Sequence, residues 1–242
     1  MSKSNLELDV ASMSSGYVSG QRTDKRLSGS SPSGSPKRQK ALSFLSIDDP
    51  LRKAADLGHG QDVAAVLRAG VDIKYALHTA SKLGLSHLVS ALVVLGLEVT
   101  LADSHGLQPL CVAAAAGHHS CVISLVAAKA DPDTVCSDAP KSFPLLVGAR
   151  QGHLLTVNWL LAAGASPNKS DSHDSTALHE ACGRGHEEVA LVLVTAGASI
   201  TALDDQCRMP MHRAAGFGRE DLVKSLISAG APIDAQVLFL NL

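Results

Sequence analysis

The sequence predicts an all-α protein built from stacked helix pairs, preceded by a disordered tail. Three observations lead to this fold class. From about residue 50 onward the chain repeats itself in six registered copies. Its 242 residues are 45% hydrophobic but only 3% aromatic, so small and aliphatic side chains must build the core, as in closely packed helices. The first 46 residues are rich in Ser, Gly, Pro, Lys and Arg and hold few residues able to form a core.

The tail, residues 1–46, is expected to remain flexible because so few apolar groups cannot offset the entropy of ordering. Its stretch "KRLSGSSPSGSPKRQK" has the spacing of a bipartite nuclear import signal, although flexible tails are often basic by chance. The import candidates are Lys25, Arg26, Lys37, Arg38 and Lys40. Ser35 resembles a proline-directed kinase site, and phosphate there would partly neutralise the neighbouring basic cluster. "SSGYVS" adds Ser15 and Ser19 as phosphorylation candidates.

The repeat domain is expected over residues 47–235. Its copies begin near residues 47, 75, 101, 134, 169 and 202, so that the repeats run over about 47–74, 75–100, 101–133, 134–168, 169–201 and 202–235. One glycine is shared by every copy, and successive shared glycines are separated by 26, 33, 35, 33 and 33 residues. They are Gly58, Gly84, Gly117, Gly152, Gly185 and Gly218.

Each copy predicts two helices joined at its shared glycine. A Pro or Ala starts a short first helix with an Ala-rich face, and Gly follows because it takes a left-handed turn cheaply. In the second helix apolar residues cover one broad side, as Val189, Leu191 and Val192 do after the acidic residues Glu187 and Glu188. One pair alone would leave that side in water, so neighbouring pairs must stack as a quasi-linear solenoid.

These repeats resemble the ankyrin family over roughly residues 50–235. The stretch "TALHEACGRGHEEVALVLVTAGAS", residues 176–199, carries the resemblance most clearly. It implies an ankyrin-type helix-turn-helix solenoid with short β-hairpin fingers. Two departures stand out: the first two repeats lack seven residues between Gly70 and Ala76, and Lys129 replaces the glycine expected after a second helix. That second helix is therefore expected to end less cleanly.

The final segment, residues 236–242, is short and apolar, and it follows the last repeat where a further one would be expected. A solenoid needs a polar terminal cap. The sequence "VLFLNL" is therefore expected either to fold back over the last helices or, as favoured here, to mark a truncated product of a longer gene.

Histidine and cysteine residues could suggest a metal site around "AAAAGHHSCV", residues 113–122. His118, however, occupies the same repeat slot as His59, His153 and His186, and equivalent slots lie about 10 Å apart, too far to share an ion. The resemblance implies that the remaining repeated histidines hydrogen-bond to loop backbone, namely His78, His179 and His212. His179, Glu180 and Cys182 fall on repeat positions without an oxyanion loop, so we expect no metal, no cofactor and no enzyme.

Cys111, Cys121, Cys136, Cys182 and Cys207 are odd in number and form no Cys-x-x-Cys pair, which suits free thiols in a reducing compartment. No apolar run reaches the length of a membrane span. The expected location is intracellular, in the cytoplasm and, through the tail, the nucleus. The formal charge of −2 indicates neither nucleic acid nor membrane as a partner.

The resemblance implies protein partners bound through finger tips and the exposed side of the first helices. A modestly basic strip is expected there, to bind an acidic segment beside apolar anchors; the alternative is that these charges only keep the surface soluble. The candidates are Lys82, Leu83, His105, Leu107, Arg150, Gln151, His173, Arg184, Arg208 and Phe217. The predicted function is a non-catalytic scaffold or adaptor, without a small-molecule substrate. The alternative is a phosphorylation-controlled regulator that sequesters a transcription factor.

Overall fold

The computed structural model describes residues 53–68, 75–136 and 141–233. The predicted tail, the connection at 69–74 and the apolar end at 236–242 lie outside this part of the chain. A π-helical turn, η1 (Ala55–His59), comes first in it. The α-helices that follow are α3 (Gly60–Arg68), α4 (Ala76–Lys82), α5 (Ser86–Val94), α6 (Pro109–Ala116), α7 (His119–Ala127), α8 (Pro144–Gln151), α9 (Leu154–Ala162), α10 (Ala177–Arg184), α11 (Glu187–Thr195), α12 (Pro210–Gly216) and α13 (Glu220–Ser228).

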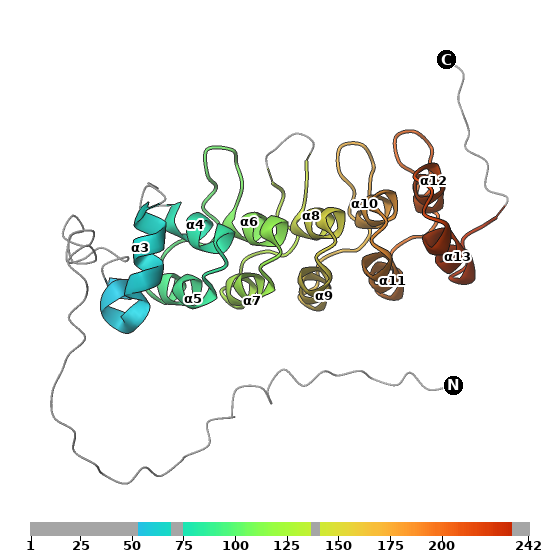
Figure 1. Cartoon of the computed structure of the whole chain (residues 1–242). Coiled ribbons are helices and arrows are strands. Elements are labelled where there is room, and N and C mark those ends of the chain that lie inside the picture. The colour runs from blue at the N-terminus through green and yellow to red at the C-terminus, as the bar shows by residue number, and fades with distance from the viewer. Residues whose placement is uncertain (1–52, 69–74, 137–140, 234–242) are drawn as a thin grey trace, which may run out of the picture. The chain divides into compact units, whose positions relative to one another are not determined.

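The helices stand in two rows, with long loops projecting beside one of them (Figure 1). The inner row holds the first helix of each pair, from α4 to α12, and the outer row holds the second helices, from α5 to α13. The principal helix contacts join members of one pair or of neighbouring pairs. The molecule is therefore a helical solenoid over the described residues, as the sequence predicted.

The ends of the inner helices follow the predicted Pro and Gly signals. Pro109, Pro144 and Pro210 occupy the first turns of α6, α8 and α12, where a missing N–H costs nothing. The shared glycines end the helices in the left-handed region, with φ of +75° at Gly117 and +76° at Gly152.

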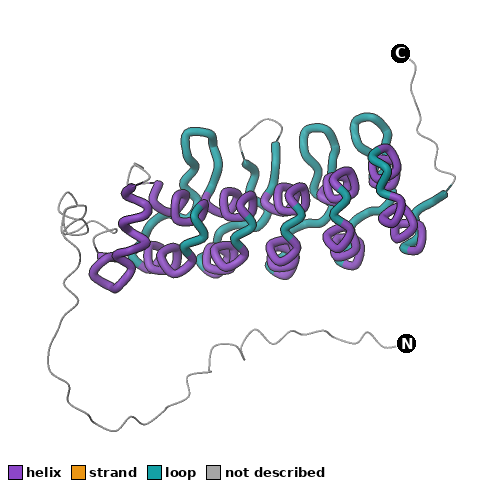
Figure 2. The backbone as a smooth tube through the Cα atoms, in the orientation of Figure 1, coloured by secondary structure: helices purple, strands orange, loops and turns teal. Residues whose placement is uncertain are grey.

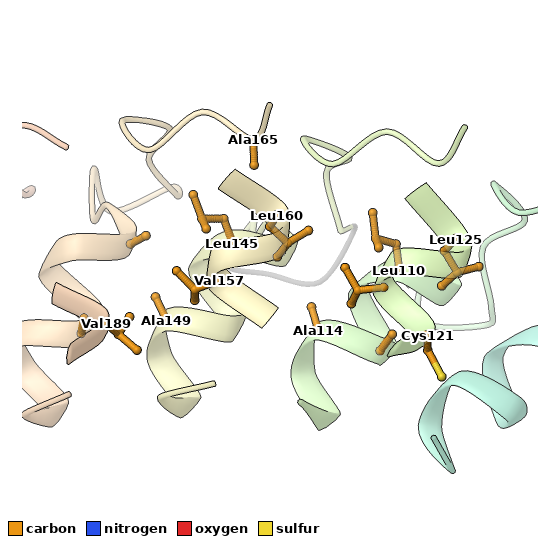
Figure 3. Close-up of a cluster of buried hydrophobic side chains, with 14 of the residues drawn as sticks. Leu110, Ala114, Cys121, Leu125, Leu145, Ala149, Val157, Leu160, Ala165 and Val189 are labelled. Carbon is orange, nitrogen blue, oxygen red and sulfur yellow. The ribbon is translucent and has the colours of Figure 1, made fainter. Parts of the chain in front are cut away.

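The core lies between the two rows. Leu110, Leu125 and Leu160 are completely buried, and Ala114 and Ala149 are buried beside them. Figure 3 shows these side chains gathered between helices of neighbouring pairs. Each buried leucine contributes roughly 1.5–3 kcal/mol, while the alanines let the inner helices approach one another closely. Helix pairs thus depend on their neighbours for stability.

The fingers are loops rather than ladders of strands (Figure 2). In the described residues, single antiparallel bridges close two of them, between Cys136 and Ser142 and between Ser170 and Thr176. The first pair differs from the others because its shared glycine, Gly58, lies inside η1 instead of after a helix, at φ +105°.

Helix α7 ends as regularly as the other second helices although Lys129 follows it, contrary to the sequence-based expectation. Lys129 adopts φ +69°, the left-handed conformation that Gly96, Gly164 and Gly197 take at the same place in other repeats. Its N–H bonds to Val126 O at 2.9 Å, and α7 spans nine residues, as α9 does. The repeat imposes the turn on a residue that disfavours it.

Two of the five cysteines are not free thiols, which corrects the interpretation drawn from their number. Cys111 of α6 forms a disulfide with Cys136 in the finger before α8. Cys121, Cys182 and Cys207 are free. Neither the odd number of cysteines nor the lack of a Cys-x-x-Cys pair could predict this disulfide, because it joins a helix to a finger 25 residues further along the chain.

Candidate functional site

Aspartate side chains stabilise the turns at the finger tips by accepting hydrogen bonds from the backbone. Asp103 Oδ1 accepts hydrogen bonds from the backbone N–H groups of His105 and Leu107, at 2.8 and 3.0 Å. Asp171 and Asp204 do the same in the two following described fingers, each binding the second and fourth residues after it. This turn presents the candidates His105 and His173 at one equivalent position, and the candidates Leu107 and Arg208 at another, two residues further on. The recurring Asp is visible in the aligned sequence, but the candidate list omitted it.

Two families of histidines fasten neighbouring repeats together. His118, His153 and His186 each place Nε2 at 3.1–3.2 Å from a carbonyl oxygen of the preceding inner helix. His78 and His179 each place Nε2 at 2.9 Å from a finger carbonyl, of Leu107 and Arg208 respectively. These contacts confirm the structural role that the repeat implied. The described residues contain no cluster of three side chains suited to holding a metal ion.

Cys182 and His179 are not arranged as a nucleophile and its base. Cys182 is completely buried, and burial raises the pKa of its thiol to about 12. At neutral pH it is therefore a thiol rather than the reactive thiolate. His179 has both ring nitrogens occupied, Nε2 by the Arg208 carbonyl and Nδ1 by the backbone N–H and hydroxyl of Thr176.

Among the described residues, three hollows that contain binding candidates open on the face formed by the inner helices and fingers. The first, which we name the N-terminal groove, has a volume of about 690 Å³ and contains the candidates Lys82, His105 and Leu107. The central hollow, about 260 Å³, contains Arg150, His173 and Arg208. The C-terminal hollow, about 310 Å³, contains Arg184 and Phe217. Leu83 and Gln151 are exposed but line none of the three.

The N-terminal groove is mainly apolar. Val112, Ala115, Ala116 and Val147 contribute to it, together with the Cys111–Cys136 disulfide. His78 lies in its wall with 6% of its surface exposed, and its Nδ1 has no hydrogen-bond partner among the described residues. Burial lowers the pKa of His78 below 6.5, against the opposing effect of the Leu107 carbonyl.

A buried carboxylate organises the central hollow. Glu180, on α10, is 7% exposed and lies 2.7 Å from Arg150 Nε and 3.1 Å from Arg213 Nη1. The Ser175 hydroxyl donates to its Oε1 at 3.2 Å. Burial alone would raise the pKa of Glu180, but the Arg150 hydrogen bond and charge, with Arg213 and Ser175, outweigh it and hold that pKa below 4.5. Glu180 is therefore an anion shared by two guanidinium groups.

Two further candidates in this hollow are also paired. Arg208 places Nη2 at 2.9 Å from Asp204 Oδ2, and His173 Nδ1 lies 2.9 Å from Asp205 Oδ2. Three of the six groups in the anticipated basic strip therefore already face carboxylates. The structure divides that strip, leaving Lys82 at one end and Arg184 at the other without an ion pair in the part of the chain it describes.

Arg213, Glu180 and Arg219 were absent from the list of binding candidates. Glu180 was considered only as part of a catalytic arrangement, whereas the structure makes it the link between three repeats. Its partners lie 30 and 33 residues away, about one repeat in each direction. A search of the alignment for opposite charges one repeat apart could have found both pairs.

Comparison with known proteins identifies the repeat type. Residues 145–237 match a family model described as ankyrin repeats, in three copies. The chain is also similar to the E3 ubiquitin-protein ligase KEG of Arabidopsis thaliana, with 32% identity over 151 residues, or 62% of the chain. It spans only 9% of that protein. The family model accounts for three copies, so six ankyrin copies remain a prediction although the helix pairs continue through α4–α7.

Proposed function

This chain is an ankyrin repeat protein, and we propose that it works as a non-catalytic scaffold or adaptor that grips a partner protein with its inner helices and fingers. Ankyrin repeats form protein–protein interaction domains and are generally non-catalytic. The observation that carries the proposal is the face described above, where three hollows open beside exposed residues that the repeat itself does not require. Among the described residues no helix is long and apolar enough to cross a membrane.

Exposed apolar side chains at the ends of the inner helices support this assignment. Leu83 follows α4 and is 46% exposed, and Phe217 follows α12 and is 62% exposed. Interfaces often use a few large apolar side chains as anchors, and Phe217 lines the C-terminal hollow. The outer helices offer matched controls, because Val94 on α5 is 84% exposed and Leu155 on α9 is 55% exposed.

The experiment compares two double variants of the full chain by affinity purification and mass spectrometry. Leu83→Glu with Phe217→Glu should lose the specific partners, whereas Val94→Glu with Leu155→Glu should retain them. Circular dichroism would verify that both variants fold. Equal partner recovery from the two variants would contradict binding through the inner face.

A regulator that sequesters a transcription factor is the second candidate, supported by the phosphorylation candidates Ser15, Ser19 and Ser35 in the tail. The stretch "SSGYVS" is similar to the phosphodegron of ankyrin-type inhibitors of Rel transcription factors, although Ser14 stands where an acidic residue leads that motif. Such a regulator would capture one nuclear protein stoichiometrically, whereas an adaptor would bridge two partners. Size-exclusion chromatography of reconstituted complexes distinguishes these outcomes.

The proposed location is intracellular, cytoplasmic and nuclear. Its support is the basic tail, whose import candidates would be tested by replacing Lys37 and Arg38 with Ala and imaging a tagged chain. The likeness to an E3 ubiquitin-protein ligase supports a shared interaction segment. It does not extend to ligase activity, because so little of that protein is covered.

A further inference from the structure

Arg219 departs from the pattern that fastens neighbouring repeats. In three earlier repeats the residue after the shared glycine is a histidine, and its ring contacts the carbonyl of Lys82, Ala115 or Arg150. In the last repeat Arg219 holds this place, and the equivalent carbonyl is that of Gly183. Arg219 makes no hydrogen bond to it and has no ion pair among the described residues. A position used for stacking elsewhere thus carries an unpaired guanidinium group.

The C-terminal hollow brings this group together with a second unpaired cation. Arg184, at the end of α10, and Arg219 both line it, along with Arg213, Glu180, Gly183 and Phe217. The Arg219 side chain lies across Gly185, where a β-carbon would come within 2.7 Å of its Nε. Counting one negative and three positive groups, the hollow carries a net charge of about +2.

Three of the carboxylates nearby already have partners. Glu180 is held by Arg150 and Arg213, so it leaves Arg184 and Arg219 uncompensated. Asp221, two residues after Arg219, pairs with Lys224 at 3.1 Å. Glu187 accepts a hydrogen bond from the Ser225 hydroxyl at 2.7 Å. Glu220 is exposed next to Arg219 in sequence and makes no ion pair with it.

An apolar group and a packed glycine complete the hollow. Phe217 is 62% exposed, so it offers contact area to a ligand. Arg213 and Phe217 pack against Gly183, where a β-carbon would lie 3.5 Å from Arg213 Nε. A volume of about 310 Å³ is at the lower limit of ligand sites and suits one or two side chains of a peptide.

We propose that the C-terminal hollow binds an Asp or Glu side chain that lies next to an apolar residue in a partner peptide. Arg184 and Arg219 receive the carboxylate, and Phe217 packs against the apolar neighbour. Guanidinium groups donate paired hydrogen bonds that match a carboxylate. A carboxylate is favoured over a phosphate because it carries one negative charge instead of about two, so that repulsion from Glu220 and Asp221 in the first turn of α13 is smaller. This inference rests on the proposed function and specifies its partner chemistry.

The test is selection from a random dodecapeptide display library against the full-length protein at pH 7.5. Enriched peptides should share an acidic residue beside an apolar one. The strongest peptide is then synthesised with a fluorescent label, and its Kd is measured by fluorescence anisotropy. Versions with Gln or phosphoserine in place of the acidic residue should both bind about tenfold or more weakly.

Arg219→His with Arg184→Gln is the informative variant. The histidine restores the side chain used in other repeats, so the fold should be kept while both free cations are removed. This variant should bind the selected peptide about tenfold or more weakly. Lys141→Gln is the control, because it removes an exposed cation from the finger before α8, outside all three hollows, and its affinity should equal that of wild type.

Several outcomes would overturn the proposal. These are a library that yields no enriched peptide, enriched peptides without acidic residues, tighter binding of the phosphoserine version, or equal affinity of the Arg variant and wild type. The proposed function fails separately, when the Leu83→Glu, Phe217→Glu variant retains every partner. If that variant loses its partners while the Arg variant keeps peptide binding, only the carboxylate site is wrong.

Discussion

At the residue scale, the shared glycines serve two purposes, and the sequence revealed only one. Their positive φ was predicted from the turn they make. The structure shows a second reason for glycine at three of these positions. The histidine ring of the following repeat packs directly against the glycine, where a β-carbon would stand. A β-carbon on Gly152 would come within 2.6 Å of His186 Nδ1, and one on Gly117 within 2.7 Å of the His153 ring.

Gly152→Ala should therefore be much more destabilising than Gly164→Ala. Both glycines lie at positive φ, +76° and +93°, but a β-carbon on Gly164 would meet nothing within 4 Å. Backbone strain alone costs about 1–2 kcal/mol, and displacing His186 adds about 1 kcal/mol for its lost hydrogen bond. Urea unfolding should show a loss of about 2–3 kcal/mol for Gly152→Ala. Equal losses for the two variants would exclude the role of the ring.

Stability should fall as the pH drops through 6.5, because two histidines are held neutral. Burial lowers the pKa of His179 and His78 below their ordinary value of 6.5. The unfolded chain then binds more protons than the native chain, so protonation favours unfolding. Urea unfolding at pH 7.5 and 5.5 should show lower stability at pH 5.5, and His179→Gln should reduce that difference. Equal unfolding free energies at the two pH values would contradict this prediction.

The carboxylates add a second loss of stability at lower pH. Glu180 and Asp204 are buried, which alone would raise their pKa values, yet hydrogen bonds from Arg150 and Arg208 respectively, with further contacts, hold them below 4.5 and 3.8. Their contribution is present above these ordinary values and disappears as the pH falls through the lowered ones. An unfolding free energy that stays constant from pH 5 to 3 would contradict these pairs.

At the element scale, the helices could be predicted from local signals, whereas the links between them could be found only by comparing residues one repeat apart or from the structure. Pro109 and Gly117 predict the start and end of α6, because the backbone preferences of Pro and Gly do not depend on the rest of the fold. The pairing of Cys111 with Cys136, or of Glu180 with Arg150 and Arg213, depends on which residues the stacking brings together. Lys129 is a further example, because a lysine disfavours the left-handed backbone conformation that the surrounding repeat imposes on it.

The disulfide should stabilise the finger before α8 measurably. It closes a loop of 25 residues, for which loop entropy gives roughly 3 kcal/mol. Reductant should therefore lower the unfolding free energy of the wild type by about 2–4 kcal/mol. Cys111→Ala should be less stable than the oxidised wild type and insensitive to reductant.

Thiol counting gives an independent check on the same link. Denatured protein without reductant should show three thiols, from Cys121, Cys182 and Cys207, and reduced protein should show all five. Five thiols in both samples would contradict the disulfide. The pairing also weakens the cysteine-based inference of a reducing compartment, because disulfides persist mainly in oxidising ones.

At the scale of the whole molecule, stability is transmitted from neighbour to neighbour along the solenoid. Each inner helix packs on the inner helices beside it, as α8 lies between α6 and α10. Within the described residues the pair α12–α13 has helices on only one side. A cavity made there should loosen one interface, whereas a cavity in the middle should loosen two.

Hydrogen exchange with mass spectrometry can separate these cases using two matched substitutions. Leu226 in α13 and Leu125 in α7 are both completely buried, so replacing either with Ala removes the same side-chain volume. Leu226→Ala should accelerate exchange in α12 and α13 and leave α4–α9 protected. Leu125→Ala should accelerate exchange in α6 and α7 and also in the pairs on both sides, α4–α5 and α8–α9. Uniform acceleration of exchange in all helices by either variant would contradict this prediction. It would mean that the described repeats unfold together in one cooperative step, with no local opening of single helix pairs.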